Sequence, residues 1–279
     1  MDASLPEVSS DIVDRVEPDA AAPDTAAPDA TRDAPSTDDV PRDVSMPTDT
    51  AADSATTVLL EDDFESYAFG ATWTDGTPFG PWTATYSGFG SNSIERDTTQ
   101  VLGEAPMAST TLGETHASLV LSRAVLGDLD LTVRLRTVSQ LRTPTPNAWE
   151  VAWVIWHYTD EGHFYYFAAK PNGWELGKVD NTRADPSGPA CAWPAYQNCA
   201  YPGAQRYLDT GSSPAFPLGS WYSVRVRHVA ASFEVSVDGV SISTFTDAER
   251  PYPSGTVGLY NEDSHVQFDD VRAITPTGP

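Results

Sequence analysis

Residues 149–178 concentrate the side chains that could do chemistry in this chain. These 30 positions hold four Trp, three Tyr, two Phe, two His and two Lys. Trp and Tyr rings stack on the apolar faces of sugar rings, while carboxylate, ammonium and guanidinium groups hydrogen-bond hydroxyls and carboxylates. The stretch therefore predicts a groove that binds a glycan. The candidate ligand-binding residues are Glu150, Trp156, Tyr158, Tyr166, Trp174, Glu175, Lys178, Arg136 and Arg225.

Both faces of this stretch carry bulky rings. Alternation puts Trp153 and His157 on one face of a first strand and Trp156 and Tyr158 on the other. An ordinary sandwich strand has a polar outer face, so two aromatic faces need two environments. Either one face packs the core and the other lines a concave groove, or both faces are buried, the outer one beneath residues 181–220.

The same residue types could support catalysis. β-Elimination on a uronate-containing polysaccharide needs a cation or amide to neutralise the substrate carboxylate, and a base such as Tyr or His to remove the C5 proton. An arginine on a non-core face could equally be paired with a carboxylate on a solvated surface. If the protein is an enzyme, the candidate catalytic residues are Tyr166, His157, His163, Lys170 and Arg134.

Short alternating strands must position these side chains. Apolar and polar residues alternate clearly over 129–138 and 221–228, and Asp238-Gly239 is a strong hairpin signal between two further strands. No segment shows a sustained helical period. The pattern predicts an all-β fold, a two-sheet antiparallel β-sandwich of jelly-roll type. Other strands are expected at 117–122, 150–158, 163–170, 174–179, 256–260 and 266–274.

The order of the motifs resembles a known family. Asp62-Asp63-Phe64-Glu65 opens the series, the aromatic stretch follows, and Phe268-Asp269-Asp270-Val271 closes it. This order is similar to that of the concanavalin A-like lectin/glucanase superfamily, including its laminin-G-like and secreted bacterial branches, over about residues 60–275. The resemblance implies the sandwich fold, but the superfamily includes lectins, carbohydrate-binding modules, glycoside hydrolases and polysaccharide lyases.

Two catalytic signatures of that superfamily are missing from the sequence. The laminarinase-like hydrolases carry Glu-x-Asp-x-x-Glu or Glu-x-Asp-x-Glu, which puts two carboxylates on one strand face, and nothing here matches. The jelly-roll alginate lyases carry a Gln-Ile/Val-His strand, which Ile155-Trp156-His157 echoes only loosely because the Gln is absent. The sequence therefore supports neither of these known catalytic activities, and glycan binding is the first hypothesis.

The resemblance also implies a structural calcium ion. In lectin-like jelly rolls an opening Asp or Glu and a closing Asp often share calcium with backbone carbonyls, and hard oxygen ligands suit this ion. The residues that match are Glu65 and Asp270, then Asp63. The alternative is an acidic edge that discourages strand pairing.

Residues 1–57 differ sharply from residues 58–279. They hold 14 acidic and three basic residues, seven prolines and no aromatic residue. Such a segment cannot bury enough apolar surface to offset its ordering entropy, so we expect a disordered acidic tether (1–57) before one β-sandwich domain (58–279). The tether resembles those of bacterial surface lipoproteins, which implies an extracellular or cell-surface location. No signal segment is present in this sequence, and a cytoplasmic protein with a disordered tail is the alternative.

The two cysteines point to the same compartment. Cys191 and Cys199 stand in a Pro/Tyr/Trp-rich segment with no Cys-x-x-Cys motif and no nearby His. A disulfide closing a short loop is therefore expected, rather than a redox pair or a metal clip, and it implies an oxidising compartment.

Composition excludes several partners. With 40 acidic and 16 basic residues the net charge is -24, which argues against nucleic acid and anionic membranes as partners. No apolar stretch approaches the ~20 residues that span a bilayer, and no zinc-type His spacing, P-loop or nucleophile elbow occurs.

We expect a monomer that binds a polysaccharide or other glycan. The second hypothesis is a polysaccharide-cleaving enzyme, a lyase before a hydrolase, and the third is a laminin-G-like adhesion module.

Overall fold

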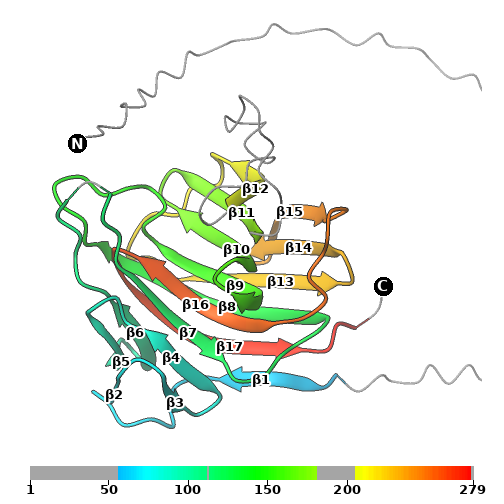
Figure 1. Ribbon diagram of the computed structural model, residues 1–279. Coiled ribbons are helices and arrows are strands. Elements are labelled where there is room, and N and C mark those ends of the chain that lie inside the picture. The colour runs from blue at the N-terminus through cyan, green and yellow to red at the C-terminus, as the bar shows by residue number, and fades with distance from the viewer. Residues whose placement is uncertain (1–55, 112, 181–204, 278–279) are drawn as a thin grey trace, which may run out of the picture. The chain divides into compact units, whose positions relative to one another are not determined.

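The protein folds as a β-sandwich. The computed structural model describes residues 56–111, 113–180 and 205–277. Over these residues the chain contains no helix, and its strands form two antiparallel sheets packed face to face (Figure 1), as the alternating pattern predicts. Within the same part of the chain no helix could therefore cross a bilayer. Residues 1–55 lie outside the described residues, so the tether and the boundary at residue 57 stay predictions.

Nine strands form the first sheet, here called sheet A, and eight form sheet B. In order across sheet A the strands are β15 (Val240–Thr246), β14 (Ser232–Val237), β13 (Tyr222–Val229), β8 (Leu129–Gln140), β17 (Ser264–Ile274), β6 (Gln100–Ala105), β5 (Ser91–Arg96) and β2 (Thr72–Trp73), with β1 (Val58–Asp62) paired to β17. Across sheet B they are β12 (Gln205–Gly211), β11 (Gly173–Asp180), β10 (His163–Lys170), β9 (Ala152–Asp160), β16 (Thr256–Glu262), β7 (Ala117–Ser122), β4 (Trp82–Tyr86) and β3 (Thr77–Phe79).

The core lies between the two sheets and follows the alternation of the sequence. In β8 the apolar positions Leu129, Leu131 and Val133 are fully buried, whereas Thr132 and Arg134, which follow Leu131 and Val133, are partly exposed. Each side chain of this size that leaves water contributes ~1.5–3 kcal/mol to folding. Burial of one face of β8 thus fixes its register, because a shift of one residue would turn every apolar side chain outward.

The hairpin signal in the sequence is confirmed. Asp238 and Gly239 join β14 to β15 with φ values of 51° and 79°. Two consecutive residues with positive φ make the tight turn whose twist matches that of the flanking strands, and Asp-Gly tolerates this backbone well.

The first and last strands of the sandwich pair with each other. Val58 of β1 lies opposite Ile274 of β17, and the two strands run side by side at one edge of Figure 1. The backbone N–H of Thr275 donates to the carbonyl of Thr57 at 2.9 Å. Both ends of the sandwich therefore leave from one end of the same strand pair.

A buried carboxylate at the end of β1 connects the two sheets. Asp62 accepts hydrogen bonds from the indole nitrogen of Trp82 in β4 (2.9 Å), the hydroxyl of Tyr67 (2.6 Å) and the backbone N–H of Phe64 (2.9 Å). These three donors satisfy the buried carboxylate in place of water. Asp62 therefore fixes the end of β1 against β4.

Candidate functional site

Sheet B is apolar on both faces. One face supplies Trp156, Tyr165 and Phe167 to the core between the sheets. The other, which points away from sheet A, is here called the aromatic face. Its apolar residues are Tyr86, Leu119, Leu121, Val151, Trp153, Ile155, Tyr158, Phe164, Tyr166, Ala168 and Tyr260.

Stacked rings form the centre of the aromatic face. Trp153 and Tyr166 are stacked with an interplanar angle of 24° and ring centroids 4.5 Å apart, and Tyr260 meets Trp153 edge-on at 5.3 Å. The ring of Tyr166 lies across β11 at Gly177, where a Cβ would come within 2.1 Å of Cζ of Tyr166. The side-chain amide of Gln205 donates to the Tyr166 hydroxyl at 2.6 Å. Gly177 thus leaves the space that this ring occupies.

A depression of about 360 Å³ opens on the aromatic face beside these rings. Leu119, Ile155 and Tyr158 are among its apolar lining, and Glu161 lies at its edge. Burial, reinforced by Glu161 and Asp160, raises the pKa of Tyr158 to about 12, so its hydroxyl stays protonated and can donate a hydrogen bond. The full lining is Tyr86, Ala117, Leu119, Ile155, Tyr158, Glu161, Phe164 and Tyr260, here called the aromatic pocket.

A β-bulge in β9 brings Tyr158 into this pocket. Strict alternation would put Tyr158 on the same side as Trp156, which lies in the core. His157, however, has a φ of 51°, and the pairing of β9 with β16 shifts register between Tyr158 and Ile155. Such an irregularity re-aims the side chains that follow it, so Tyr158 joins Ile155 on the aromatic face.

A carboxyl group adjoins the pocket through Tyr260. The Tyr260 hydroxyl donates to Oε1 of Glu262 at 2.7 Å, and Glu262 lies opposite the pocket residue Ala117 in the pairing of β16 with β7. Burial, with the nearby charges of Asp263 and Glu150, raises the pKa of Glu262. The pocket therefore has at its end a carboxyl group that holds its proton more tightly than an exposed one.

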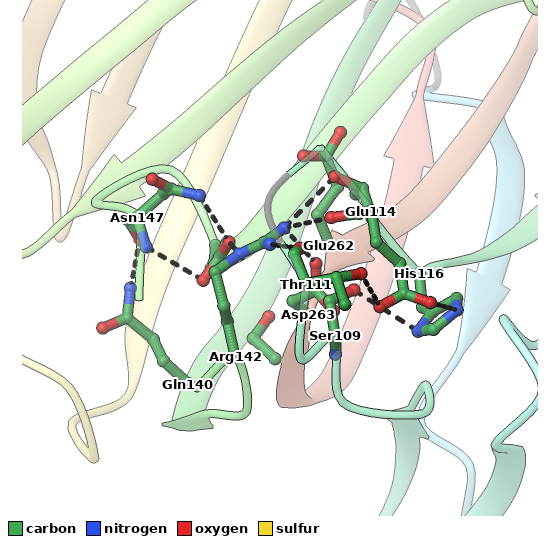
Figure 2. A network of polar contacts seen from close by, with 12 residues as sticks. Ser109, Thr111, Glu114, His116, Gln140, Arg142, Asn147, Glu262 and Asp263 are labelled. Atoms are coloured by element: carbon green, nitrogen blue, oxygen red, sulfur yellow. Dashed lines mark hydrogen bonds and ion pairs between the residues drawn. The ribbon is translucent and has the colours of Figure 1, made fainter. Parts of the chain in front are cut away.

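A polar network lies behind this carboxyl group (Figure 2). Arg142 donates to Glu150, to Oδ2 of Asp263 (2.7 Å) and to the carbonyl of Glu114 (2.7 Å). Asn147 donates to Glu150 from its side chain (2.8 Å) and its backbone (3.0 Å). Glu150, predicted to bind ligand, is fully buried and occupied by these donors. In this position the carboxylate holds the segment before β9 in place, and a role of Glu150 in ligand binding stays a prediction.

A second depression lies on the same side of sheet B, towards β12. It measures about 460 Å³ and brings together three predicted residues, Lys170, Trp174 and Glu175, with Tyr207. Lys170 is ion-paired with Glu175, and the indole of Trp174 donates to the carbonyl of Ser213 at 3.1 Å. The Lys170–Glu175 pair can contact a ligand here, whereas the ring of Trp174 is buried and packs against the core.

Three predicted residues lie in the core instead. Trp156 is fully buried between the sheets. Nζ of Lys178 is also buried, 2.7 Å from Oδ2 of Asp247, and donates to two backbone carbonyls. The two ring nitrogens of His157 lie 2.8 Å and 2.9 Å from the carbonyls of Tyr252 and Gly127. None of the three is part of the aromatic pocket lining.

The predicted arginines belong to the other sheet. Arg134 and Arg136 lie on strand β8 of sheet A and flank the ring of Trp221 at 4.8 Å and 4.9 Å. Arg225 is paired with Asp130 at 2.7 Å. These cations are on the outer side of sheet A, so they cannot neutralise a ligand carboxylate on the aromatic face.

His163 lies at the turn between β9 and β10. Its Nδ1 is 2.7 Å from Oδ1 of Asp160. The position is close in sequence to the pocket residue Glu161, but the ring itself is not part of the pocket lining.

The three predicted calcium ligands make other contacts. Glu65 accepts a hydrogen bond from the backbone of Gln100 at 2.9 Å, and Asp270 accepts one from Arg134 at 2.9 Å. Asp63 accepts one from the backbone of Glu65 at 3.1 Å. Among the described residues, no group of three or more His, Cys, Asp or Glu side chains is placed to hold a metal ion. Cys191 and Cys199 lie outside the described residues, so the disulfide stays a prediction.

Two solved structures are among those similar to this chain. A carbohydrate-binding module, CBM66 from Bacillus subtilis, is 13% identical, with a TM-score of 0.46, and the match covers 69% of this chain and 94% of that chain. A beta-glucanase from Bacillus licheniformis is 10% identical, with a TM-score of 0.47, and the match covers 78% of this chain and 97% of that chain. No curated protein matches the sequence.

A family model matches most of the sandwich domain. It covers residues 70–274 and describes a 3-keto-alpha-glucoside-1,2-lyase-like domain. The match includes every residue of the aromatic pocket, from Tyr86 to Tyr260. Because it spans more than half of the 279 residues, the chain belongs to the family of 3-keto-alpha-glucoside-1,2-lyase-like domains.

Proposed function

We propose that the protein binds a glycan or glycoside on the aromatic face of sheet B, with one sugar unit in the aromatic pocket. The pocket carries this proposal, since partly exposed rings surround an apolar floor on the outside of a sheet that would ordinarily be polar there. A volume of about 360 Å³ is within the range of small-ligand sites. The rings of Tyr86, Tyr158, Phe164 and Tyr260 would contact the apolar side of the sugar.

The second depression favours a ligand longer than one sugar unit. Phe164 of the aromatic pocket and Lys170 of the second depression share strand β10 and the same face. Six residues of a strand span about 20 Å at ~3.3 Å per residue. A single sugar ring could not reach both places, so occupation of both would select oligosaccharides.

Cleavage by elimination is the second candidate, and the family match favours it. The family description names a lyase acting on 3-keto-α-glucosides, in which the ketone at C3 acidifies the hydrogen at C2. Elimination across C1 and C2 needs a base close to the sugar ring, and Glu262 adjoins the pocket through Tyr260. Binding and elimination would use the same pocket. A laminin-G-like adhesion role would need neither.

We also propose an extracellular or cell-surface location. It is supported by the acidic, proline-rich composition of residues 1–57 and by the pair of cysteines in residues 181–204. A surface location would bring the aromatic face into contact with external glycans.

Binding can be tested by gel retardation in neutral and uronate polysaccharides and by calorimetry with a 3-keto-α-glucoside. We expect Tyr158→Ala to weaken retention or affinity by up to about 10-fold, since stacking contacts of ~0.5–1.5 kcal/mol are lost. Phe69→Ala is the control, because Phe69 is an exposed aromatic ring outside the pocket lining. Absence of binding to every glycan, or equal loss in both variants, would refute the proposal. Shortened products would establish cleavage.

A further inference from the structure

We propose that Glu262 is the proton-accepting residue of the aromatic pocket and that Tyr260 positions it. This inference rests on the proposed function, because it assigns a role at the same pocket to a residue outside its lining. The ligand would be a glycoside with a carbonyl group at C3 of the sugar.

Glu262 is connected to the pocket from two directions. Tyr260, which lines the pocket, donates to Oε1 of Glu262 at 2.7 Å. Ala117, which also lines the pocket, lies directly opposite Glu262 across the β16–β7 pair. The carboxyl group therefore stands on the aromatic face, beside the pocket wall.

One oxygen of Glu262 remains available. Oε1 is engaged by Tyr260, whereas Oε2 has no hydrogen-bond partner within the described part of the chain, and the side chain is only partly exposed. A carboxylate with one oxygen fixed and the other open can accept a proton at a defined position. The Tyr260 contact would set the orientation of that open oxygen.

The neighbouring arginine does not neutralise Glu262 by direct contact. Arg142 donates to Glu150 and Asp263, and no hydrogen bond joins it to Glu262 among the described residues. Burial and the two other carboxylates accordingly raise the pKa of Glu262. A base whose pKa lies closer to neutral removes a carbon-bound proton more effectively than an ordinary exposed carboxylate.

The other ionisable groups near the pocket are less suitable as bases. Burial raises the pKa of Tyr260 far above the usual value for a phenol, so Tyr260 stays protonated and acts as a donor. His157 lies in the core. Glu161 is exposed at the pocket edge, where water competes for its oxygens. Glu262 is the carboxylate that combines partial burial with a fixed orientation.

The proposed step can be written with its atoms balanced. The C2–H bond of the 3-keto glycoside breaks, and its proton passes to Oε2 of Glu262. The electron pair forms a C1=C2 double bond conjugated to the C3 ketone, while the C1–O bond to the leaving group breaks. Water protonates the leaving oxygen, and Glu262 later returns its proton to water. The products are an enone and an alcohol, with no oxidant or reductant required.

Proton removal can be separated from bond cleavage by NMR. The full chain would be incubated in D₂O with a methyl 3-keto-α-glucoside, and loss of the C2 proton signal would be followed together with release of methanol. Calorimetry would measure binding of the same compound. The variants are Glu262→Gln and Tyr260→Phe, and the control is Glu61→Gln, an exposed carboxylate on β1 of sheet A.

The proposal gives different results for the three variants. Glu262→Gln should bind the ligand within a few-fold of the parent protein but lose the C2 proton ~10²–10⁴-fold more slowly. Tyr260→Phe should remain active with its pH–rate profile moved to higher pH, because the lost hydrogen bond lowers the pKa of Glu262 in the parent protein. Glu61→Gln should behave as the parent.

The pH–rate profile of Glu262 is also influenced by the charged and titratable groups near it. These are Tyr260, Asp263, Glu150, Arg142 and Tyr86.

The possible failures point to different conclusions. If Glu262→Gln loses the C2 proton as fast as the parent, the role of Glu262 is refuted. If the parent binds the glycoside without any loss of the C2 proton, the inference is also refuted, although the proposed binding function stands. If the parent protein binds no glycoside and no polysaccharide, the proposed function itself fails.

Discussion

The indole N–H of Trp156 donates to Nδ1 of His228 over 3.0 Å, and this contact joins sheet B to sheet A in the core. Because Nδ1 is the acceptor, the proton of neutral His228 is on Nε2, which donates to the carbonyl of Ala230 at 2.9 Å. The ring of His157 stacks on His228 with centroids 4.4 Å apart. A second proton on His228 would break the Trp156 contact and bring a charge into the core.

We therefore expect the stability of the domain to fall with acid. Burial, with the nearby His157, lowers the pKa of His228 to about 4. The unfolded chain takes up this proton at the ordinary pKa of about 6.5. The contribution of neutral His228 to the free energy of unfolding is thus fully present above pH 6.5. It is lost as the pH falls towards 4. Urea unfolding followed by Trp fluorescence between pH 7.5 and 5 measures this slope. It should be shallower in His228→Gln, and an unchanged slope would contradict the assignment.

Glu104 should have the opposite pH dependence. It is fully buried, accepts from the side chain of Asn261 at 3.0 Å, and has an Oε1 without a partner. Burial raises its pKa well above the usual value, so its contribution is present below about pH 4.5 and is lost as the pH rises. Glu104→Gln keeps an acceptor for Asn261 and cannot ionise. Calorimetry should show a higher Tm than the parent near pH 8 and no gain near pH 4. A lower Tm at pH 8 would count against this account.

Lys178 should be far more important for stability than an exposed cation. Its Nζ is fully buried against Asp247, which also accepts from the hydroxyl of Tyr165 at 2.6 Å. Lys178→Met leaves that carboxylate buried without its cation, and breaking such a pair costs ~3–5 kcal/mol. Arg272→Gln, which breaks an exposed pair with Glu61, should change stability little. Denaturant unfolding measures the free energy of unfolding of both variants. An equal loss of stability in the two would contradict this prediction.

Gly177 should be required for the shape of the aromatic face. A methyl group there would overlap the ring of Tyr166, so Gly177→Ala should displace this ring and cost ~1–3 kcal/mol of stability. Glycan retention should weaken at the same time, because Tyr166 stacks on Trp153. Gly127→Ala is the control, since a Cβ at Gly127 meets nothing closer than 3.8 Å. Normal retention by a folded Gly177→Ala protein would argue against a role for this surface.

Calcium can be tested by chelation. Glu65, Asp63 and Asp270 are the proposed ligands, although each carboxylate already has a protein donor. If calcium stabilises this edge, EGTA should lower the Tm and added calcium should restore it, because a ligand bound only by the folded state adds stability. An unchanged Tm would refute the proposal that calcium stabilises this fold.

The sequence predicts the strands best where one face is polar. In β8 and β13 apolar and polar residues alternate, and apart from the buried Asp130 the burial of the central positions follows that alternation. Strands β2 to β6 are harder to recognise. They are short, and buried polar residues such as Asn92 and Glu104 interrupt their apolar pattern.

The site is harder to predict because it lies on a sheet with two apolar faces. Periodicity separates Trp153 from Trp156 but cannot say which of them faces sheet A. Beyond that choice, the positive φ of His157 moves Tyr158 to the opposite side from Trp156, and no residue pattern signals this bulge. Tyr86 and Tyr260 reach the pocket from strands far apart in the sequence, so only the strand order brings them to β9.

The pairing of β1 with β17 also determines how the domain would carry a mechanical load. Thr57 and Thr275 leave from the same end of this antiparallel pair, so a force between the two ends would unzip its hydrogen bonds one after another. A force that enters at Thr57 and leaves through a glycan on the aromatic face must instead cross between the sheets. The hydrogen bond from Trp82 to Asp62 lies on that route. Such a force would therefore act on contacts between the two sheets rather than on the β1–β17 pair.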